Sequence, residues 1–448
     1  MRVVAGGTGG GPGERRRWAL GPLVALAVVT GVCTGAVPAP SPVAPGSWGR
    51  LGALSYAAGR ATPLEIERLA AVREVLDRRA TALLRRDRAG WLAGVDPAAH
   101  AFRGRQAAFF ERIATVPLGV WRYTVEPEDE AGEAAAAGRP WTVRVTLRYT
   151  LRGVDPAPTA RPLVLTFVPR GERWLLAADD RTAVNGVRSW RGPWEHGPLV
   201  VRRGRSSLVL AHPANADRLR TFADAVDAAV PRVTRVVGTT WPRRVAVFIP
   251  DDQREMAEVV GERLALGKIA AVAVADSVDP SSGQARGQRV VVNPANLDRL
   301  GPLGRRVVLQ HEVTHVATRG ITGHGTPIWL VEGFADWVGY LGSGLPPRLV
   351  GDELRAQVRS GRWPGRLPTA ADFRGDSPRL AVAYEEAWSA CRLIAGRAGP
   401  AGLLRFYRAV GTSDDPAAAV DGELRRAVGM GSAQFVAEWR RGVRAEFG

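Results

Sequence analysis

A short motif, His-Glu-Val-Thr-His at residues 311–315, places two histidines four residues apart. On a helix, residues four apart project from the same face, about one turn from each other. Both imidazoles can therefore reach one Zn²⁺ ion, for which imidazole is a common ligand. Glu312 follows the first histidine directly and lies beside the metal without binding it, where it can accept a proton from a zinc-bound water. The motif predicts hydrolytic zinc chemistry, with His311 and His315 as metal ligands and Glu312 as the catalytic base.

A third zinc ligand must come from the segment that follows, where His324 and Glu332 are the candidates. His324 lies in a glycine-containing loop at residues 320–325. Glu332 lies on the next predicted helix, which Thr326 is expected to cap. A side chain held on a helix loses less conformational entropy on binding a metal than one in a flexible loop. We therefore expect Glu332 to be the third ligand.

Asp336 lies one helical turn after Glu332, on the same predicted face. From that position its carboxylate can accept the outer N–H of a metal-binding histidine. Such a contact fixes the tautomer and the orientation of the ring.

The segments HEVTH at 311–315 and WLVEGFADW at 329–337 together resemble the gluzincin peptidases, the clan of thermolysin and aminopeptidase N. The chain is most similar to exported bacterial peptidase-MA-like domains, over about residues 198–448. The resemblance implies a zinc metallopeptidase in which a tyrosine lies near the scissile carbonyl, and Tyr384 in the segment AVAYEEAWSA is the candidate. Sixteen residues separate His315 from Glu332, two fewer than is usual in aminopeptidase N relatives. The glutamates that anchor the substrate amine in aminopeptidases are not visible, so endopeptidase and exopeptidase action both stay open.

The C-terminal part of the chain contains the elements that must position the motif. Short apolar runs predict strands, amphipathic stretches predict helices, and the chain reads as almost wholly helical from residue 305. The predicted strands are 199–201, 207–211, 244–249, 269–275 and 289–293, and the predicted helices are 214–237 and 253–261. The run Arg289–Asn293 is expected to form an edge of a mixed sheet and to pair with an extended substrate.

The preceding region, residues 61–180, shows helical spacing of apolar residues first and period-two alternation afterwards. Helices followed by an antiparallel sheet make an α+β domain. This order of elements resembles the ketosteroid-isomerase-like cone fold. The fold class predicted for the whole chain is therefore α+β, a cone-like domain followed by a zincin peptidase domain of mixed sheet and helical half. No chemistry is assigned to the first domain.

The N-terminus carries Arg15–Arg17 and then an uncharged apolar run at 18–37. The run is close to the ~20 residues that span a bilayer. It predicts either an uncleaved transmembrane anchor or a cleaved signal peptide, with the rest of the chain outside the cytoplasm. The expected location is the cell membrane with an extracellular catalytic domain, or the secreted state.

Shifts in composition and periodicity divide the chain into six parts. They are a cytoplasmic basic segment at 1–17, the signal peptide or anchor at 18–37, a flexible linker at 38–60, the cone-like domain at 61–180, a linker at 181–197 and the metallopeptidase domain at 198–448.

A net charge of +17 is typical of proteins that bind nucleic acid, but here the basic residues are scattered among acids and Lys268 is the only lysine. We expect no nucleic-acid binding. The two cysteines, Cys33 and Cys391, predict no disulfide within the mature fold. The oligomeric state does not follow from the sequence.

The function predicted from the sequence is hydrolysis of a peptide or protein substrate outside the cytoplasm, with Zn²⁺ as cofactor and membrane attachment through the N-terminal segment. Two alternatives stay open. One is a non-catalytic cell-surface binding protein with a relict zinc site, against which the intact Glu312 argues. The other is a zinc hydrolase that acts on a non-peptide bond, because the motif specifies activation of water and not the substrate.

Overall fold

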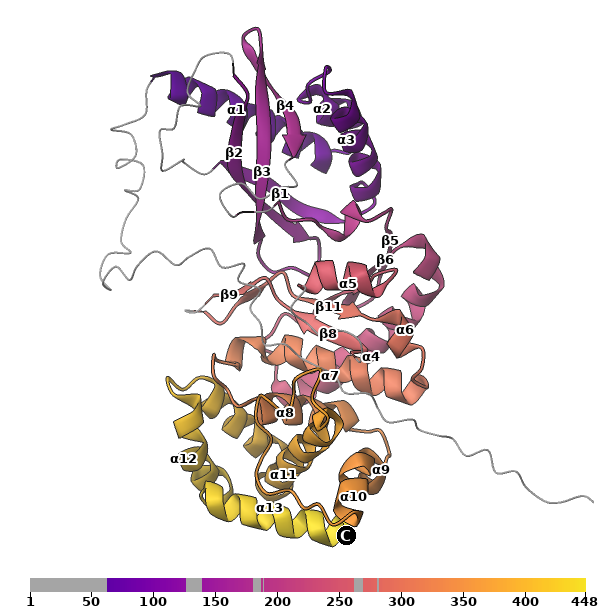
Figure 1. Cartoon of the computed structure of the whole chain (residues 1–448), viewed down its shortest axis with the longest axis vertical. Coiled ribbons are helices and arrows are strands. Elements are labelled where there is room, and N and C mark those ends of the chain that lie inside the picture. The colour runs from indigo at the N-terminus through magenta and orange to yellow at the C-terminus, as the bar shows by residue number, and fades with distance from the viewer. Residues whose placement is uncertain (1–62, 126–138, 180–186, 188, 262–268, 280–281) are drawn as a thin grey trace, which may run out of the picture.

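The computed structural model describes residues 63–448, apart from 126–138, 180–186, 188, 262–268 and 280–281 (Figure 1). The chain mixes helix and sheet, as expected for the α+β class. The predicted segments 1–17, 18–37 and 38–60 lie outside the described residues. The predicted domain boundaries stay a prediction.

The N-terminal part begins with helices and continues as a four-stranded antiparallel sheet in the order β1-β2-β3-β4. Its elements are α1 (Pro63–Leu84), α2 (Arg88–Ala93), α3 (His100–Ile113), β1 (Leu118–Val125), β2 (Trp141–Leu151), β3 (Thr159–Arg170) and β4 (Arg173–Asp179). Alternating apolar residues of the strands face the helices and form one side of a core with Trp91 and Phe110. The order of helices and strands is the predicted one, but the resemblance to a ketosteroid-isomerase-like fold is not confirmed.

A second, five-stranded sheet lies in the middle of the molecule (Figure 1). Its order is β5-β6-β7-β11-β8, with β7 parallel to both β6 and β11 and the two outer pairs antiparallel. The strands are β5 (Val200–Arg203), β6 (Ser207–Ala211), β7 (Val245–Ile249), β8 (Ala271–Val274) and β11 (Arg289–Val292), and a small hairpin pairs β9 (Ser277–Val278) with β10 (Ala285–Arg286). The expectation that Arg289–Asn293 forms the edge is wrong, because β11 lies between β7 and β8. The edge strands are β5 and β8, and β8 is the one next to β11.

Strands β6, β7, β8 and β11 of this middle sheet are buried on both faces. Along β7, Val247 packs on one side and Phe248 on the other, and along β8 the same holds for Ala273 and Val272. One face lies against α4 (Leu219–Val237) and the helical half of the chain. The other lies against the N-terminal part and α5 (Gln253–Val260). Such strands read as continuous apolar runs, because neither face meets water.

A buried ion pair lies where the N-terminal part meets this sheet. His212 Nε2 lies 2.6 Å from Glu255 Oε1, and both side chains are almost wholly enclosed. The other ring nitrogen of His212, Nδ1, lies 2.9 Å from the carbonyl oxygen of Pro198. Both ring nitrogens therefore face acceptors, which favours the protonated imidazolium.

The remaining helices form the C-terminal half, shown in orange and yellow in Figure 1. They are α6 (Pro294–Leu297), α7 (Pro302–Thr318), α8 (Ile328–Tyr340), α9 (Pro347–Val350), α10 (Asp352–Arg359), α11 (Leu380–Gly411), α12 (Pro416–Val428) and α13 (Ser432–Phe447). Short 3₁₀ turns lie at Pro193–Glu195, Pro213–Arg218 and Arg319–Ile321. Helix α7 lies between the middle sheet and α8, and α8 packs in turn on α11.

Candidate metal centre

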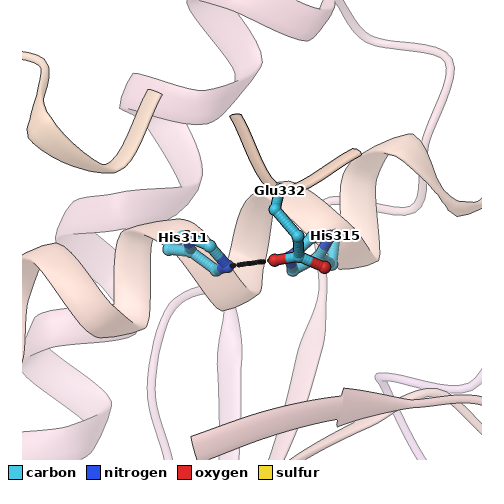
Figure 2. A group of neighbouring side chains, drawn as sticks. All are labelled: His311, His315 and Glu332. Carbon is cyan, nitrogen blue, oxygen red and sulfur yellow. Dashed lines mark hydrogen bonds and ion pairs between the residues drawn. The ribbon is translucent and has the colours of Figure 1, made fainter. Parts of the chain in front are cut away.

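The histidine motif lies on α7, whose residues from 307 to 318 are all buried. Helix α8 crosses beside it and is buried from Trp329 to Gly339. Figure 2 shows the imidazoles of His311 and His315 on α7 with the carboxylate of Glu332 turned toward both. These three side chains can offer one ligand atom each, all within 4.8 Å of one another. The sequence-predicted ligands are therefore brought together from two helices.

The distances between the three ligand atoms suit one tetrahedral ion. The Nε2 atoms of His311 and His315 lie 2.8 Å apart, and Glu332 Oε2 lies 3.4 Å and 3.5 Å from them. Ligands at about 2.0–2.1 Å from a tetrahedral zinc ion are separated by roughly 3.3 Å. Neither carboxylate oxygen of Glu332 accepts a hydrogen bond of good geometry from the residues that the structure describes. A buried carboxylate without such donors is costly, and a cation between these groups would remove that cost.

Asp336 orients the first histidine. Its Oδ1 lies 2.7 Å from His311 Nδ1, so the N–H at that nitrogen donates to the carboxylate. His311 Nε2 then faces His315 and Glu332, which is the orientation that a metal ligand needs. Burial lowers the pKa of His311, but the carboxylates of Asp336 and Glu332 outweigh it and raise that pKa. Binding of a metal at His311 would therefore release a proton.

Glu312 lies between His311 and the strand β8, since it interacts with both the His311 imidazole and the backbone N–H of Ala273. Its side chain is fully buried, and burial raises its pKa to about 7 against the opposing attraction of His311, the backbone N–H of Ala273 and Arg319. A carboxyl group with a pKa near neutrality is suited to accept and return a proton. The role of catalytic base stays a prediction, and its position and electrostatics agree with it.

Arg319 is a component of the site that the sequence analysis missed. Its guanidinium Nη2 donates to the carbonyl oxygen of Ala273 at 2.8 Å, so it binds the free edge of β8 beside Glu312. Arg319 lies four residues after His315 and eight after His311, on the same helical side. That spacing was a signal visible in the sequence.

Tyr384 lies on α11 and is buried next to the centre. Its ring centroid is 6.5 Å from that of His311 and 5.0 Å from that of Phe373, which packs edge-on against it. The structure therefore brings Tyr384 to the metal-ligand cluster, and whether its hydroxyl takes part in chemistry stays a prediction.

His324 lies apart from the cluster. It is exposed in the turn before α8 and does not belong to the metal-ligand group. The prediction that Thr326 caps α8 is wrong, because Thr326 lies before the capping position; its hydroxyl donates to the carbonyl oxygen of Gly323. The helix begins at Ile328, with Pro327 in the capping position and no side-chain cap.

Two glycines let α8 approach its neighbours closely. A Cβ on Gly333 would lie 2.3 Å from the carbonyl oxygen of Ala387 on α11, and a Cβ on Gly339 would lie 3.3 Å from Cβ of His311. Asp336 lies between these glycines, and Glu332 directly precedes Gly333. The placement of Glu332 therefore depends on a backbone contact that no larger residue at position 333 allows, while the contacts at Gly339 are tight but less severe.

The prediction that the chain is held in a membrane is contradicted by the described structure. None of the helices between residues 63 and 448, outside the gaps given above, is long and apolar enough to cross a bilayer. The apolar run at 18–37, on which that prediction rested, lies outside the described residues. The membrane attachment and membrane location are corrected accordingly.

No protein-family model matches the chain, and no curated protein matches its sequence. Among solved structures, the chain is similar to a mutant of an M1 zinc metallopeptidase from Deinococcus radiodurans, with 13% sequence identity and a TM-score of 0.34 over 73% of this chain and 95% of that one. Because this likeness is so slight, the chemistry of the site rests on its own residues.

Proposed function

We propose that the protein is a zinc-dependent peptidase. The observation that carries the proposal is the convergence of His311, His315 and Glu332 around one point, with Glu312 beside them on the same helix. A purely structural zinc site needs only metal ligands and is closed by four of them. Here three ligands leave a position free, and the adjacent buried carboxylate has no structural use.

Zinc at this site would supply Lewis acidity, which lowers the pKa of a water molecule and polarises a carbonyl oxygen. The chain supplies the proton transfers. Glu312 accepts a proton from the attacking water and passes that proton to the leaving amine. The Asp336 carboxylate keeps His311 in one tautomer while charge develops. The phenol of Tyr384 is the candidate donor to the developing oxyanion.

An extended peptide is the substrate that the surrounding strand favours. Strand β8 is one of the two edge strands of the sheet and runs beside Glu312, so its outer backbone groups can pair with a substrate strand. The carbonyl oxygen of Ala273 is bound by Arg319 in this structure, and a peptide that pairs there must displace that contact. The same guanidinium would then be available to a carbonyl or carboxylate of the substrate.

The test is Glu312→Gln in the full chain, compared with the parent on a mixed peptide library after loading with zinc. We expect the variant to bind zinc as the parent does and to cleave peptides at least about a thousandfold more slowly, because the proton acceptor is lost. Glu446→Gln is the matched control, since Glu446 pairs with Arg392 on the far side of α11. Cleavage by Glu312→Gln at the parental rate would refute the mechanism. A parent that binds zinc and cleaves no peptide would favour a non-catalytic protein or a different hydrolase.

A further inference from the structure

The N-terminal part of the chain forms hydrogen bonds with the segment that directly follows the edge strand β8. Asp276 lies two residues after the end of β8, and its side chain is 7% exposed. Its Oδ2 accepts a hydrogen bond from Thr159 Oγ1 at 2.6 Å, and its Oδ1 accepts one from Arg161. Both donors belong to β3 of the N-terminal sheet, more than a hundred residues away in sequence.

The surroundings of Asp276 are built to hold its carboxylate. Gly287 has a φ of +61°, and a Cβ there would lie 2.0 Å from Asp276 Oδ2, so only glycine fits. Arg289 on β11 lies 3.9 Å from the same oxygen and bonds the hydroxyl of Tyr149 at 2.5 Å. The backbone of Asp276 is held as well, because its N–H donates to the Arg286 carbonyl oxygen at 2.9 Å.

The other side of the same segment lies against the end of the metal-binding helix. Arg319 of α7 donates to Ala273 in β8, as described above. Gly283, between β9 and β10, touches Gly320 so closely that a Cβ on it would lie 2.6 Å from the Gly320 carbonyl oxygen. The strand that faces Glu312 is therefore clamped between the N-terminal part and α7.

We propose that Asp276 is a positioning residue through which the N-terminal part sets the distance between strand β8 and the catalytic base on α7. The catalytic consequence rests on the proposed peptidase function, and the structural consequence does not. An edge strand of four residues with one neighbour has few backbone hydrogen bonds of its own. Its position is therefore sensitive to what holds its end. The Arg161–Asp276 pair adds little net stability, because desolvation offsets much of the attraction, and its proposed role is therefore to hold Asp276 in one arrangement.

The first test follows the strand and needs no activity. Amide hydrogen exchange is measured for residues 271–275 in the full chain carrying Thr159→Val or Arg161→Met. Each change removes one hydrogen bond to Asp276, and Thr159→Val is nearly isosteric, so it remains informative if the arginine variant folds poorly. The matched controls are Thr142→Val, which breaks the 2.7 Å contact between the Thr142 and Thr166 hydroxyls, and Arg170→Met, which breaks the pair with Asp96. Both controls lie within the N-terminal part.

We expect exchange at residues 271–275 to be at least about tenfold faster in the two test variants and within about twofold of the parent in the controls. Exchange within α7 should stay unchanged. Equal exchange at β8 in the parent and both test variants would overturn the proposal, as would an equal effect of the controls.

The second test measures catalysis in the same variants. Positioning predicts that kcat/KM falls about tenfold or more while the zinc affinity stays within about twofold, because the ligands on α7 and α8 do not contact Asp276. Loss of zinc together with activity would instead indicate general loosening and would contradict the proposal. If the parent cleaves no peptide, the proposed function fails, and the exchange experiment still decides whether Asp276 positions the strand.

Discussion

The contact between Gly333 and α11 allows a sharp test of how the third ligand is held. Gly333 follows Glu332 directly, and a Cβ added to it would lie 2.3 Å from the carbonyl oxygen and 2.6 Å from the carbonyl carbon of Ala387. These are backbone atoms, so Gly333→Ala must push α8 about 1 Å away from α11 in a close-packed interior. Overpacking of this kind costs up to about 3 kcal/mol. The better helix propensity of alanine returns about 1 kcal/mol, so we expect a net loss of roughly 2 kcal/mol.

The effect on the metal should exceed the effect on stability. Ligand distances at a zinc site are held within about 0.2 Å, and a 1 Å displacement of Glu332 breaks that limit. We expect Gly333→Ala to lower the zinc affinity about 10- to 100-fold. Competition with a chromogenic chelator measures the affinity, and denaturant unfolding of the metal-free chain measures the stability.

The matched control is Gly442→Ala on α13, where nothing lies within 4 Å of the added Cβ. That change should raise the free energy of unfolding by about 0.5–1 kcal/mol and leave zinc binding unchanged. If Gly333→Ala bound zinc and unfolded like the parent, the close packing of α8 on α11 would not be what positions Glu332.

Three further outcomes are expected. Glu332→Ala should lose most of the zinc affinity, while His324→Ala keeps it within about tenfold. The reverse result in a zinc titration would show that His324 in the loop is the third ligand. Tyr384→Phe should lower kcat about 10- to 1000-fold at unchanged zinc content. A change in thermal stability alone would show that Tyr384 has only a structural role in the core. Burial lowers the pKa of His212, but the carboxylate of Glu255 outweighs it and raises that pKa, so the stabilisation is present below pH ~6.5 and is lost as the pH rises through the raised value. His212→Gln should therefore cost about 1–3 kcal/mol at pH 6 and clearly less at pH 9, and a cost independent of pH in denaturant unfolding would contradict the charged pair.

The features that the sequence predicted correctly are local ones. The grouping of His311, His315 and Glu332 could be predicted because it depends only on the helical repeat and on a short connection between two helices. The strand order could not be predicted in this way. β8 consists of alternating alanine and valine, β11 is Arg289 followed by three valines, and neither shows polar alternation, because both faces of the sheet are covered here. Which of them forms the edge depends on pairing between distant segments, and no pattern within either run records it.

Other differences have local physical causes that sequence reasoning weighed wrongly. Thr326 was expected to cap α8, but the helix begins one residue later than that requires, so Pro327 takes the capping position and the Thr326 hydroxyl donates to the carbonyl oxygen of Gly323. Arg319 was passed over because it lies beyond the five-residue motif, although it shares the helical side of the histidines. Its partner Ala273 has no side chain that could mark it, and the contact is made by a backbone oxygen.

The burial of the middle sheet on both faces has a consequence for how the molecule melts. Val247 and Phe248 are neighbours in one strand, yet one completes the core of the helical half and the other completes the core shared with the N-terminal part. Neither core can lose its packing without exposing one face of the same five strands. Heating should therefore produce a single cooperative transition in place of the two steps that independent units show, and helices α7 and α8 should lose their structure at the same temperature as the N-terminal sheet.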